Sequence, residues 1–438
     1  MMSPRTPWLR LTWSQVVVML GFALAFLQLF HMLLLNRLEA RNSSMRQTEA
    51  PYYLKKDTQT VYPIIEHAIK SSRIMDASGQ YNIIYDVMQS SAFSTNDTGL
   101  MMKQYGVTLV THCSVNHIHH LIQLSHHWQG PVSVAIFIPQ EYSSTVVQSL
   151  LVLHYCMPHL RKNISIHLVY PMTQSPLSVQ FPSFVPEISR CRDFHEVLDT
   201  VLQQQFRPMQ NYAFEGQSYP NNLLRNVAAR FLPTDYLLVI DIDIIPSPNL
   251  FLSFVDFARR TSFATETGSL DAQVVYVVPV FELQRGVELP QDKSSLLQLW
   301  KQGLVRPFYY DLCWKCQRPT DYDTWRNLTS SADLHNQYEV VWKDPWEPFY
   351  IGSKYSLPRY DERFKQYGFN RISQVCETHI AGFRFAVLDN AFLVHLGFKT
   401  QEGYHQGKEM EQELNRQLFR KFKEELKIKY PESARRCY

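Results

Sequence analysis

The sequence predicts an α/β fold with a buried parallel sheet and a polar site at its edge. Residues 107–170 alternate strand-like and helix-like stretches in the order β-α-β-α-β, which favours parallel strands joined by right-handed crossovers. Tyr236–Ile240 is a further apolar run of strand type, and two acidic residues, Asp241 and Asp243, follow it closely. Open α/β sheets bind ligands beyond the carboxyl ends of their strands, so the acidic pair marks the expected site.

The composition is that of a large globular chain. It has 438 residues, of which 45% are hydrophobic, and this suffices for an extensive core in one or two domains. The formal net charge of +3 argues against nucleic acid as a partner. Aromatic residues make up 13% of the chain, and they can line a sugar site as well as fill a core.

The N-terminal region is expected to anchor the chain in a membrane. Val16–Leu35 is almost wholly apolar, and about 20 apolar residues span the hydrocarbon core of a bilayer. We therefore expect a single-pass type II protein with its short N-terminal tail in the cytosol. A cleaved signal peptide is the alternative, and it would deliver the chain to the same secretory lumen. The expected organisation is a tail at 1–13, an anchor at 14–35, a stem at 36–75 and a lumenal domain at 76–438.

Sequons and cysteines agree with a lumenal location. Four Asn-x-Ser/Thr sequons are candidates for N-glycosylation: Asn42, Asn96, Asn163 and Asn327. All 7 cysteines follow the anchor, so most are expected to be paired, and the odd count leaves at least one over. Cys313 and Cys316 form a Cys-x-x-Cys pair, and without a second such pair they predict a structural disulfide position rather than a zinc site.

Strands and helices alternate in the first half of the lumenal domain. The expected strands and helices are Val107–Thr111, a helix within Asn116–Trp128, Val132–Ile138, a helix within Ser143–Tyr155, and Ile164–Tyr170. Ser114 or Asn116 is positioned to cap the first helix, and Gly130-Pro131 to end it. Five histidines crowd this helix, and we expect a solvent-exposed face rather than a metal cluster: His117, His119, His120, His126 and His127.

The helix before the acidic pair carries candidate binding residues. Cys191–Phe206 is expected to be helical, and a further helix covers Tyr219–Arg230, with Pro220 in its first turn. Arg225 and Asn226 lie off much of its apolar stripe. A guanidinium pairs strongly with phosphate oxygens, so Arg225 is a candidate ligand for a diphosphate. The alternative is a surface arginine.

Asp241 and Asp243 predict a metal–diphosphate site. Burying two carboxylates is costly unless a cation neutralises them. Their alternation puts both on one side of the chain if it stays extended. Oxygen donors of this kind suit a hard divalent ion that keeps positions open for phosphate oxygens. The alternative is that the two carboxylates cap the next helix or pair with arginines.

The second half is expected to be irregular at first and regular at its end. A helix at Phe251–Arg260, a strand at Gln273–Phe281, a loop-rich stretch at 284–335, a helix ending at Thr378 and a strand pair at Phe385–Val394 are expected, followed by His395. The aromatic segment Trp342–Tyr350 fits either a sugar platform or a packed core corner. The last helix is expected to pack through an apolar stripe with four-residue spacing: Met410, Leu414, Leu418, Phe422 and Leu426.

Together, the anchor, the stem, the acidic pair and the Val394-His395 that ends the last expected strand pair resemble a GT-A glycosyltransferase. Longer motifs resemble the glucuronyltransferase family that includes the second catalytic domain of the LARGE glycosyltransferases. The matching motifs span roughly residues 70–438 and are Ser218–Asn226, Val239–Ser247 (VIDIDIIPS), Arg306–Cys313, Asp344–Tyr350, Asp361–Glu377 and Phe392–Lys399.

The resemblance implies a particular reaction. Asp241, Asp243 and His395 would hold Mn²⁺ with the diphosphate of UDP-glucuronate, and transfer would invert the sugar into a β1,4 link. The acceptor would be a terminal xylose on the O-mannosyl glycan of α-dystroglycan, and in the Golgi the product would prime extension by LARGE. The alternatives are a β-1,3-N-acetylglucosaminyltransferase of poly-N-acetyllactosamine, a non-catalytic scaffold for a partner transferase, and a lectin-like module.

The catalytic base is the open question within this resemblance. Many inverting GT-A enzymes carry an acid just after a glycine, but Gly368-Phe-Asn-Arg371 has none. Asp361 and Glu362 are the expected catalytic residues, with Glu347 as a further candidate, and Asp361 has turn capping as an alternative role. For the donor we expect Arg225 and Asn226 near the diphosphate, and Lys399 or Arg306 at the sugar carboxylate.

Overall fold

The computed structural model describes residues 73–91, 97–138, 162–172, 218–263, 270–400 and 407–437, with six isolated positions besides. The chain divides into a unit at Met1–Val61 and a larger compact unit at Tyr62–Tyr438. The expected tail, anchor and most of the stem lie outside the described residues, as do Cys191–Phe206 and most of Ser143–Tyr155. Within the described ranges, no helix is long and apolar enough to cross a membrane.

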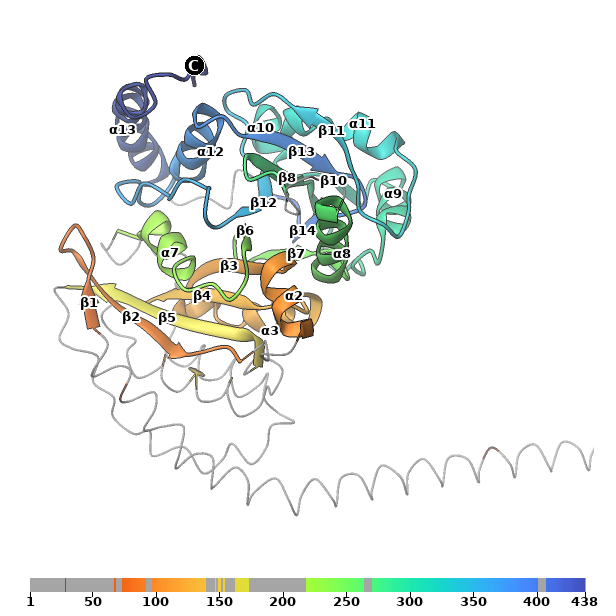
Figure 1. Ribbon diagram of the computed structural model, residues 1–438, viewed down its shortest axis with the longest axis horizontal. Helices are drawn as coiled ribbons and strands as arrows, with labels where there is room; N and C mark the ends of the chain where they lie inside the picture. Colours follow the sequence, from red (N-terminus) through yellow and green to blue (C-terminus); the bar gives the residue numbers. More distant parts are fainter. Residues whose placement is uncertain are drawn as a thin grey trace, which may run out of the picture. The chain divides into compact units, whose positions relative to one another are not determined.

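A ten-stranded mixed sheet organises the larger unit (Figure 1). Four neighbouring strands at its centre are parallel, which confirms the predicted α/β class and parallel strands. Antiparallel pairings attach the further strands on both sides, except that Arg384–Leu388 pairs in parallel with Val274–Val278. In spatial order the strands are β1 (Arg73–Met75), β2 (Tyr81–Met88), β5 (Ile164–Pro171), β4 (Val132–Phe137), β3 (Val107–Ser114), β6 (Tyr236–Val239), β12 (Phe349–Ser353), β8 (Val274–Val278), β13 (Arg384–Leu388) and β11 (Asn336–Val340).

A second sheet of four strands contributes to the site. Its order is β10 (Val305–Pro307), β9 (Val280–Leu283), β14 (Leu393–Leu396) and β7 (Ile244–Pro246). The single strand predicted at Gln273–Phe281 is wrong, because Pro279 separates β8 from β9 and the two strands enter different sheets. Proline has no backbone N–H to donate to a strand ladder, although the Pro279 carbonyl still accepts from the Leu393 amide at 2.8 Å.

The helices differ from the predicted ones at several points. They are α2 (Asp97–Tyr105), α3 (His120–His127), α7 (Asn221–Ala228), α8 (Leu250–Phe263), α9 (Lys293–Lys301), α10 (Tyr310–Gln317), α11 (Tyr322–Asn327), α12 (Asn370–Ile380) and α13 (Lys408–Lys429). The stretch 284–335 is thus not mainly loop. Its three helices are short, which weakens their periodic signal, although Asp292 and Ser295 form a capping box at the start of α9.

The start of the histidine-rich helix also differs from expectation. A 3₁₀ turn at Val115–His117 precedes α3, and neither Ser114 nor Asn116 caps the helix. The Ser114 hydroxyl instead donates to the Asn116 side chain at 2.5 Å. This local hydrogen bond uses both polar groups that were expected to serve the helix.

The core-facing side of α13 was only partly predicted. Phe422 and Leu426 are buried, but Met410 is 69% exposed and Leu414 is 60% exposed. Polar residues take the inner positions of the first turns instead, since the Asn415 amide donates to the carbonyls of Lys365 and Tyr367 at 2.8 and 2.9 Å. Hydrophobic spacing alone could not identify a helix face that is held by hydrogen bonds.

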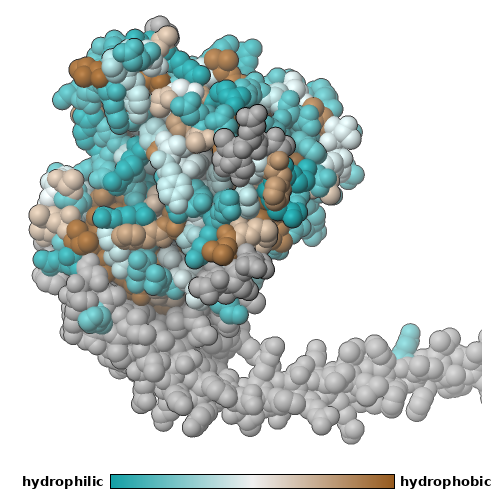
Figure 2. Space-filling model, viewed as in Figure 1, coloured by the Kyte–Doolittle hydropathy of each residue, from teal (hydrophilic) through white to brown (hydrophobic). Residues whose placement is uncertain are grey.

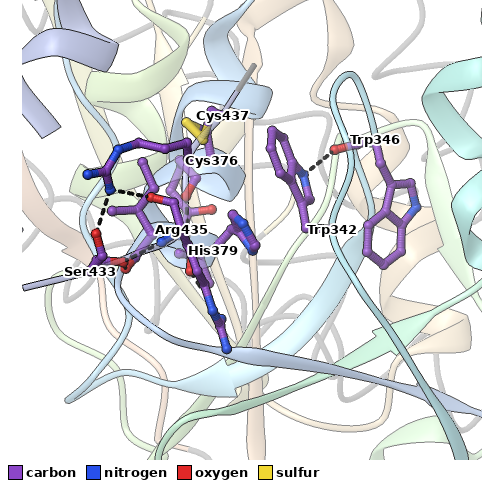
Figure 3. Close-up of a disulfide and its surroundings, with 11 residues drawn as sticks. Trp342, Trp346, Cys376, His379, Ser433, Arg435 and Cys437 are labelled. Carbon is purple, nitrogen blue, oxygen red and sulfur yellow. Dashed lines mark hydrogen bonds between the residues drawn. A yellow bond between two sulfur atoms is a disulfide. The ribbon is translucent and has the colours of Figure 1, made fainter. Parts of the chain in front are cut away.

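Two disulfides stabilise the second half. Cys313–Cys316 confirms the predicted structural disulfide position, and Cys376–Cys437 joins α12 to the C-terminal segment (Figure 3). Beside the second bond, the Arg435 guanidinium donates to the carbonyls of His379 and Phe383 at 3.1 and 2.6 Å. The end of the chain is therefore fixed against α12. Among the described cysteines, Cys113 is unpaired and buried.

The visible surface is mostly polar. On the face shown in Figure 2, hydrophobic residues of the described part form small, separate patches among hydrophilic ones. Single exposed hydrophobic residues are ordinary in globular proteins.

Candidate active site

The acidic pair lies between the two sheets. β6 ends at Val239, and the chain then turns through Ile242 and Asp243, with the Ile244 amide donating to the Asp241 carbonyl at 3.0 Å. The chain is therefore not extended across the pair, and the condition under which both side chains would lie on one side is not met. As a result of the turn, Asp241 and Asp243 contact different cationic side chains.

Asp241 lies between two arginines. The Arg225 Nη2 atom is 3.4 Å from its Oδ1 atom, and the Arg371 guanidinium binds its Oδ2 atom. Burial alone would raise the pKa of Asp241, but Arg371 and Arg225 outweigh it and lower that pKa. The arginine pairing that the sequence left as an alternative is thus present for this carboxylate.

Asp243 contacts a histidine and a lysine. Its Oδ2 atom is 3.2 Å from His395 Nε2 and 3.3 Å from Lys399 Nζ. Burial favours a raised pKa for Asp243, but Lys399 and His395 reverse the effect and lower it strongly. β14 pairs with β7 so that His395 lies opposite Ile244, which explains how a residue so distant in sequence reaches Asp243.

The hydrogen bonding of His395 favours a cation at this position. The ring faces the Gly397 carbonyl with its Nδ1 atom at 2.7 Å, and only a protonated Nδ1 can donate there. In the neutral ring the Nε2 atom is then an acceptor, and it faces a carboxylate oxygen, which is also an acceptor. A metal ion beside both atoms would resolve this opposition, as would an ion pair between the carboxylate and a charged imidazolium. Asp243 and His395 therefore fit a metal.

Asp241 does not complete a metal site in the present arrangement. Within the described part of the chain, no group of three His, Cys, Asp or Glu side chains is arranged to hold a metal. Asp241 is instead paired with Arg225 and Arg371. The metal role of Asp241 stays a prediction.

The α7 residues are buried and firmly held. Arg225 Nη1 donates to the side chains of Asn222 at 2.8 Å and Asn370 at 2.9 Å, which aims its Nη2 atom at Asp241. The Asn226 amide donates to the Tyr360 carbonyl and the Glu362 carboxylate, both at 2.8 Å. Arg225 thus faces the site, while Asn226 holds the segment that follows Tyr360.

The two acids expected to be catalytic are both engaged in other contacts. Asp361 accepts from Arg363 at several points, including the backbone amide at 3.0 Å, and Arg363 also binds Glu425. These contacts match the turn-capping alternative for Asp361. Glu362 accepts from Asn226 and lies 3.6 Å from the Arg359 guanidinium. Their catalytic roles stay predictions.

Glu347 has the environment that a general base needs. It lies just before β12 and is half-buried, and the described residues place no hydrogen bond or ion pair on its carboxylate. Burial raises the pKa of Glu347, opposed by the charge of Arg371 and assisted by that of Asp241. The charges that act on Glu347 include those of Asp241 and Arg371, which belong to the site. A carboxylate with a raised pKa and an open lone pair is suited to accept a proton.

Sequence reasoning missed Arg371, which is the strongest contact of Asp241. It is the second residue of α12, stacks on the Phe349 ring at 4.0 Å, and has a buried Nη1 atom without a hydrogen-bond partner in the described part of the chain. Burial would lower the pKa of Arg371, but Asp241 and Glu347 raise it overall. The available signal was its place in Gly368-Phe-Asn-Arg371, the motif in which related enzymes carry a catalytic acid.

Histidines near the carboxyl end of β3 were also missed as part of the site. His112 Nδ1 contacts the Tyr219 hydroxyl at 2.8 Å, its Nε2 atom is buried without a partner among the described residues, and burial lowers its pKa to about 3. Burial lowers the pKa of His120 to about 4, and the negative charge of Asp243 acts on it in the opposite direction. His117, His119 and His120 are half-buried and lie ring against ring, so the expected solvent-exposed face is wrong for them.

Comparison with known proteins identifies the family of the chain. The family described as "Glycosyl-transferase for dystroglycan" matches residues 106–431. The chain belongs to this family of glycosyltransferases, as its motifs indicated. Among individual relatives, beta-1,4-glucuronyltransferase 1 of Danio rerio is 40% identical to it over 97% of this chain and 98% of the relative. The protein of the same name from Homo sapiens is 42% identical, with 84% of each chain covered.

More distant proteins are similar over smaller parts. Xylosyl- and glucuronyltransferase LARGE1 of Homo sapiens is 26% identical over 66% of this chain and 31% of its own length. Among solved structures, GalNAc-T7 with UDP, GalNAc and Mn²⁺ aligns with 75% of this chain and 51% of its own, at 10% identity and a TM-score of 0.36.

Proposed function

We propose that the chain is an inverting GT-A glycosyltransferase that transfers glucuronate from UDP-glucuronate to a terminal xylose in β1,4 linkage. The proposed acceptor is the O-mannosyl glycan of α-dystroglycan, and the product would be extended by LARGE. The names of the relatives that are 40–42% identical over most of the chain support this reaction. The observation that carries it is the cluster of Arg225, Arg371 and Lys399 around the acidic pair, since a UDP-uronate brings both a diphosphate and a carboxylate.

Mn²⁺ is the proposed cofactor. Asp243 and His395 would hold it, with Asp241 as the third protein ligand, and carboxylates with one neutral imidazole are a suitable set for this ion. When bound, the ion would neutralise charge on the departing diphosphate. The protein itself supplies further positive charge there through Arg225 and Arg371, which are held in place before the substrate arrives.

The proposed base is Glu347. In an inverting transfer, the acceptor hydroxyl attacks the anomeric carbon on the face opposite the diphosphate and loses its proton to a base. Glu347 would take this proton, because its carboxylate is unengaged among the described residues and its pKa is raised by burial. Asp361 would have to give up its contacts with Arg363 to do the same.

A donor screen tests the proposed function. The purified protein is supplied with methyl β-xyloside, Mn²⁺ and one of several UDP-sugars, and the product is identified by mass spectrometry and NMR. We expect a glucuronylated xyloside from UDP-glucuronate alone. Transfer from UDP-N-acetylglucosamine to a galactoside instead would support the poly-N-acetyllactosamine alternative. Absence of transfer or donor hydrolysis with every donor would support a non-catalytic scaffold.

Lys399→Ala is expected to weaken the use of UDP-glucuronate. The Lys399 ammonium lies 3.3 Å from Asp243 and 5.6 Å from the Phe308 ring centre, so it borders the proposed metal and sugar positions. Loss of a charge-assisted hydrogen bond should weaken the transition-state stabilisation that kcat/KM reports by roughly 1.5–3 kcal/mol. If Lys399 binds the uronate, the affinity for UDP as a competitive inhibitor should change little. If it binds phosphate, the affinity for UDP should fall together with the use of UDP-glucuronate. A folded variant with unaltered kinetics and UDP binding would remove Lys399 from the site.

Location and modification follow from the same proposal. We propose a Golgi membrane protein with a type II anchor and a lumenal catalytic domain, glycosylated on one or more sequons and associated with LARGE. Asn327 is exposed at the end of α11, whereas Asn163 is half-buried and Ser165 of its sequon lies within β5. Asn42 and Asn96 lie outside the described residues.

Asn327 is therefore expected to carry a glycan. Asn327→Gln should remove one glycan's mass from the protein made in mammalian cells, as measured by gel mobility with and without endoglycosidase. Asn163→Gln is the matched control and should leave the mass unchanged. A full-length protein that carries no glycan and exposes its C-terminus to the cytosol would contradict the proposed topology.

A further inference from the structure

An open groove with aromatic walls adjoins the candidate active site. Its volume is about 1360 Å³, and it lies among α9, α10, α11 and the segment around β11, which Figure 1 shows grouped on one side of the second half. Five aromatic side chains line it: Trp300, Tyr310, Trp314, Tyr322 and Tyr338. No step of the proposed transfer uses these residues.

Two of the aromatic residues present open ring surface. Tyr310 is 51% exposed and Trp314 is 37% exposed, and their ring centres are 5.3 Å apart at an angle of 59°. Behind them, the buried Tyr322 lies 6.0 Å from Trp314 and donates its hydroxyl proton to the Val280 carbonyl at 2.9 Å. The Cys313–Cys316 bond lies within the same helix. Tyr322 and the disulfide therefore hold the two exposed rings in place.

Both ends of α10 connect this groove to the active site. At the first end, Arg306 lines the groove, donates to buried Glu282 at 2.8 Å and approaches the Lys399 carbonyl at 3.4 Å. Phe308 follows it, with its ring centre 5.8 Å from that of His395. At the other end, the Cys316 carbonyl accepts from the Glu347 amide at 3.0 Å. The groove therefore lies next to the Lys399–Glu347 region, with Arg306 and α10 between them.

The charge of the groove is nearly balanced. Its cationic residues are Arg306, Lys315, Arg318, Arg326 and Lys343, and its acidic residues are Asp321, Asp323, Glu339 and Asp344. This mixture does not favour a polyanion such as nucleic acid. Exposed aromatic rings with interspersed polar groups suit a ligand with apolar C–H faces and many hydroxyl groups, which is the chemistry of a sugar chain.

We propose that the groove binds the inner sugars of an oligosaccharide acceptor, with Tyr310 and Trp314 as stacking platforms. The inference rests on the proposed function, and it adds that the protein recognises several residues of the acceptor chain rather than its terminal sugar alone. Tyr310 and Trp314 take no part in the transfer step. They act on the affinity for long acceptors.

The test compares a short and a long acceptor. Tyr310→Ala and Trp314→Ala are each assayed in the full chain with UDP-glucuronate and either methyl β-xyloside or β1,4-xylotetraose. We expect each substitution to raise the KM for xylotetraose roughly tenfold, the loss expected from one exposed ring face. The KM for methyl β-xyloside and for UDP-glucuronate, and kcat, should not change. Phe263→Ala, which removes a ring that is 79% exposed on α8, is the matched control and should alter nothing.

The possible results separate the groove from the proposed function. An unchanged KM for xylotetraose in both groove variants, or an equal loss for the two acceptors, would overturn the groove proposal. A second measurement, calorimetric titration of the protein with xylotetraose in the absence of donor, does not depend on turnover. Binding by the unmodified protein that is weakened in both groove variants supports the groove even if the donor screen fails. Absence of binding by the unmodified protein overturns it.

Discussion

Asp243→Asn should reduce glycosyl transfer about 10³-fold or more, because it removes a carboxylate from the proposed metal and diphosphate position. Asparagine keeps the size of the side chain but not its charge, so Lys399 and His395 lose the anion that both contact. The measurements are transfer from UDP-glucuronate, Mn²⁺ affinity by calorimetry, and the thermal unfolding midpoint. We expect loss of transfer and of Mn²⁺ binding in a protein that remains folded.

Asp241→Asn is the informative companion to this change. If Asp241 is a metal ligand, Mn²⁺ affinity should fall as it does for Asp243→Asn. If Asp241 only balances Arg225 and Arg371, Mn²⁺ binding should persist while the unfolding midpoint falls, because Arg371 is then left in the interior without its main counter-charge. Near-normal transfer by either folded variant would exclude that residue from the metal site.

Glu347→Gln should lower kcat by roughly 10²–10⁴-fold, the usual contribution of a general base. Glutamine cannot accept the acceptor proton, but it retains the shape of the side chain, so the affinity for UDP should not change. A carboxylate acts as a base only when deprotonated. Since burial raises the pKa of Glu347, kcat/KM of the unmodified protein should fall as pH decreases through that raised pKa.

Asp361→Asn is the control that distinguishes the two candidate bases. Asp361 binds Arg363, which also binds Glu425 of α13, so its loss should loosen this contact and lower the unfolding midpoint with little change in kcat. A large fall in kcat for Asp361→Asn together with a small one for Glu347→Gln would assign the base to Asp361. The acidic limb of the pH profile should then persist in Glu347→Gln.

The parallel half of the fold could be predicted because its strands carry their signal locally. Val107–Thr111, Val132–Ile138 and Ile164–Tyr170 are apolar runs that are buried on both faces, and all three are strands in the structure. The strand at Gln273–Phe281 was wrong because one proline splits an apolar run between two sheets. The inner face of the first turns of α13 was predicted wrongly, because hydrogen bonds of Asn415, rather than apolar contacts, define that face.

The sequence predicted the acidic residues of the candidate site better than the residues that contact them. Asp241 and Asp243 follow a recognisable strand, and the structure places His395 and Lys399 beside Asp243. Arg371 could not be identified from spacing, because its contact with Asp241 depends on where α12 begins relative to β6. Glu347 could be named only as one acid among three. Its open lone pair and its burial are properties of the folded chain.

The small sheet of β10, β9, β14 and β7 affects how the protein is made. It joins segments that are far apart in the sequence, and the contact between Asp243 and Lys399 spans 156 residues. Pairings of such long range carry a high loop-closure entropy and form late in folding. During synthesis, the ribosome must therefore complete β14 before Asp243 can meet His395. The parallel half can collapse earlier, while the nascent chain is still catalytically incompetent.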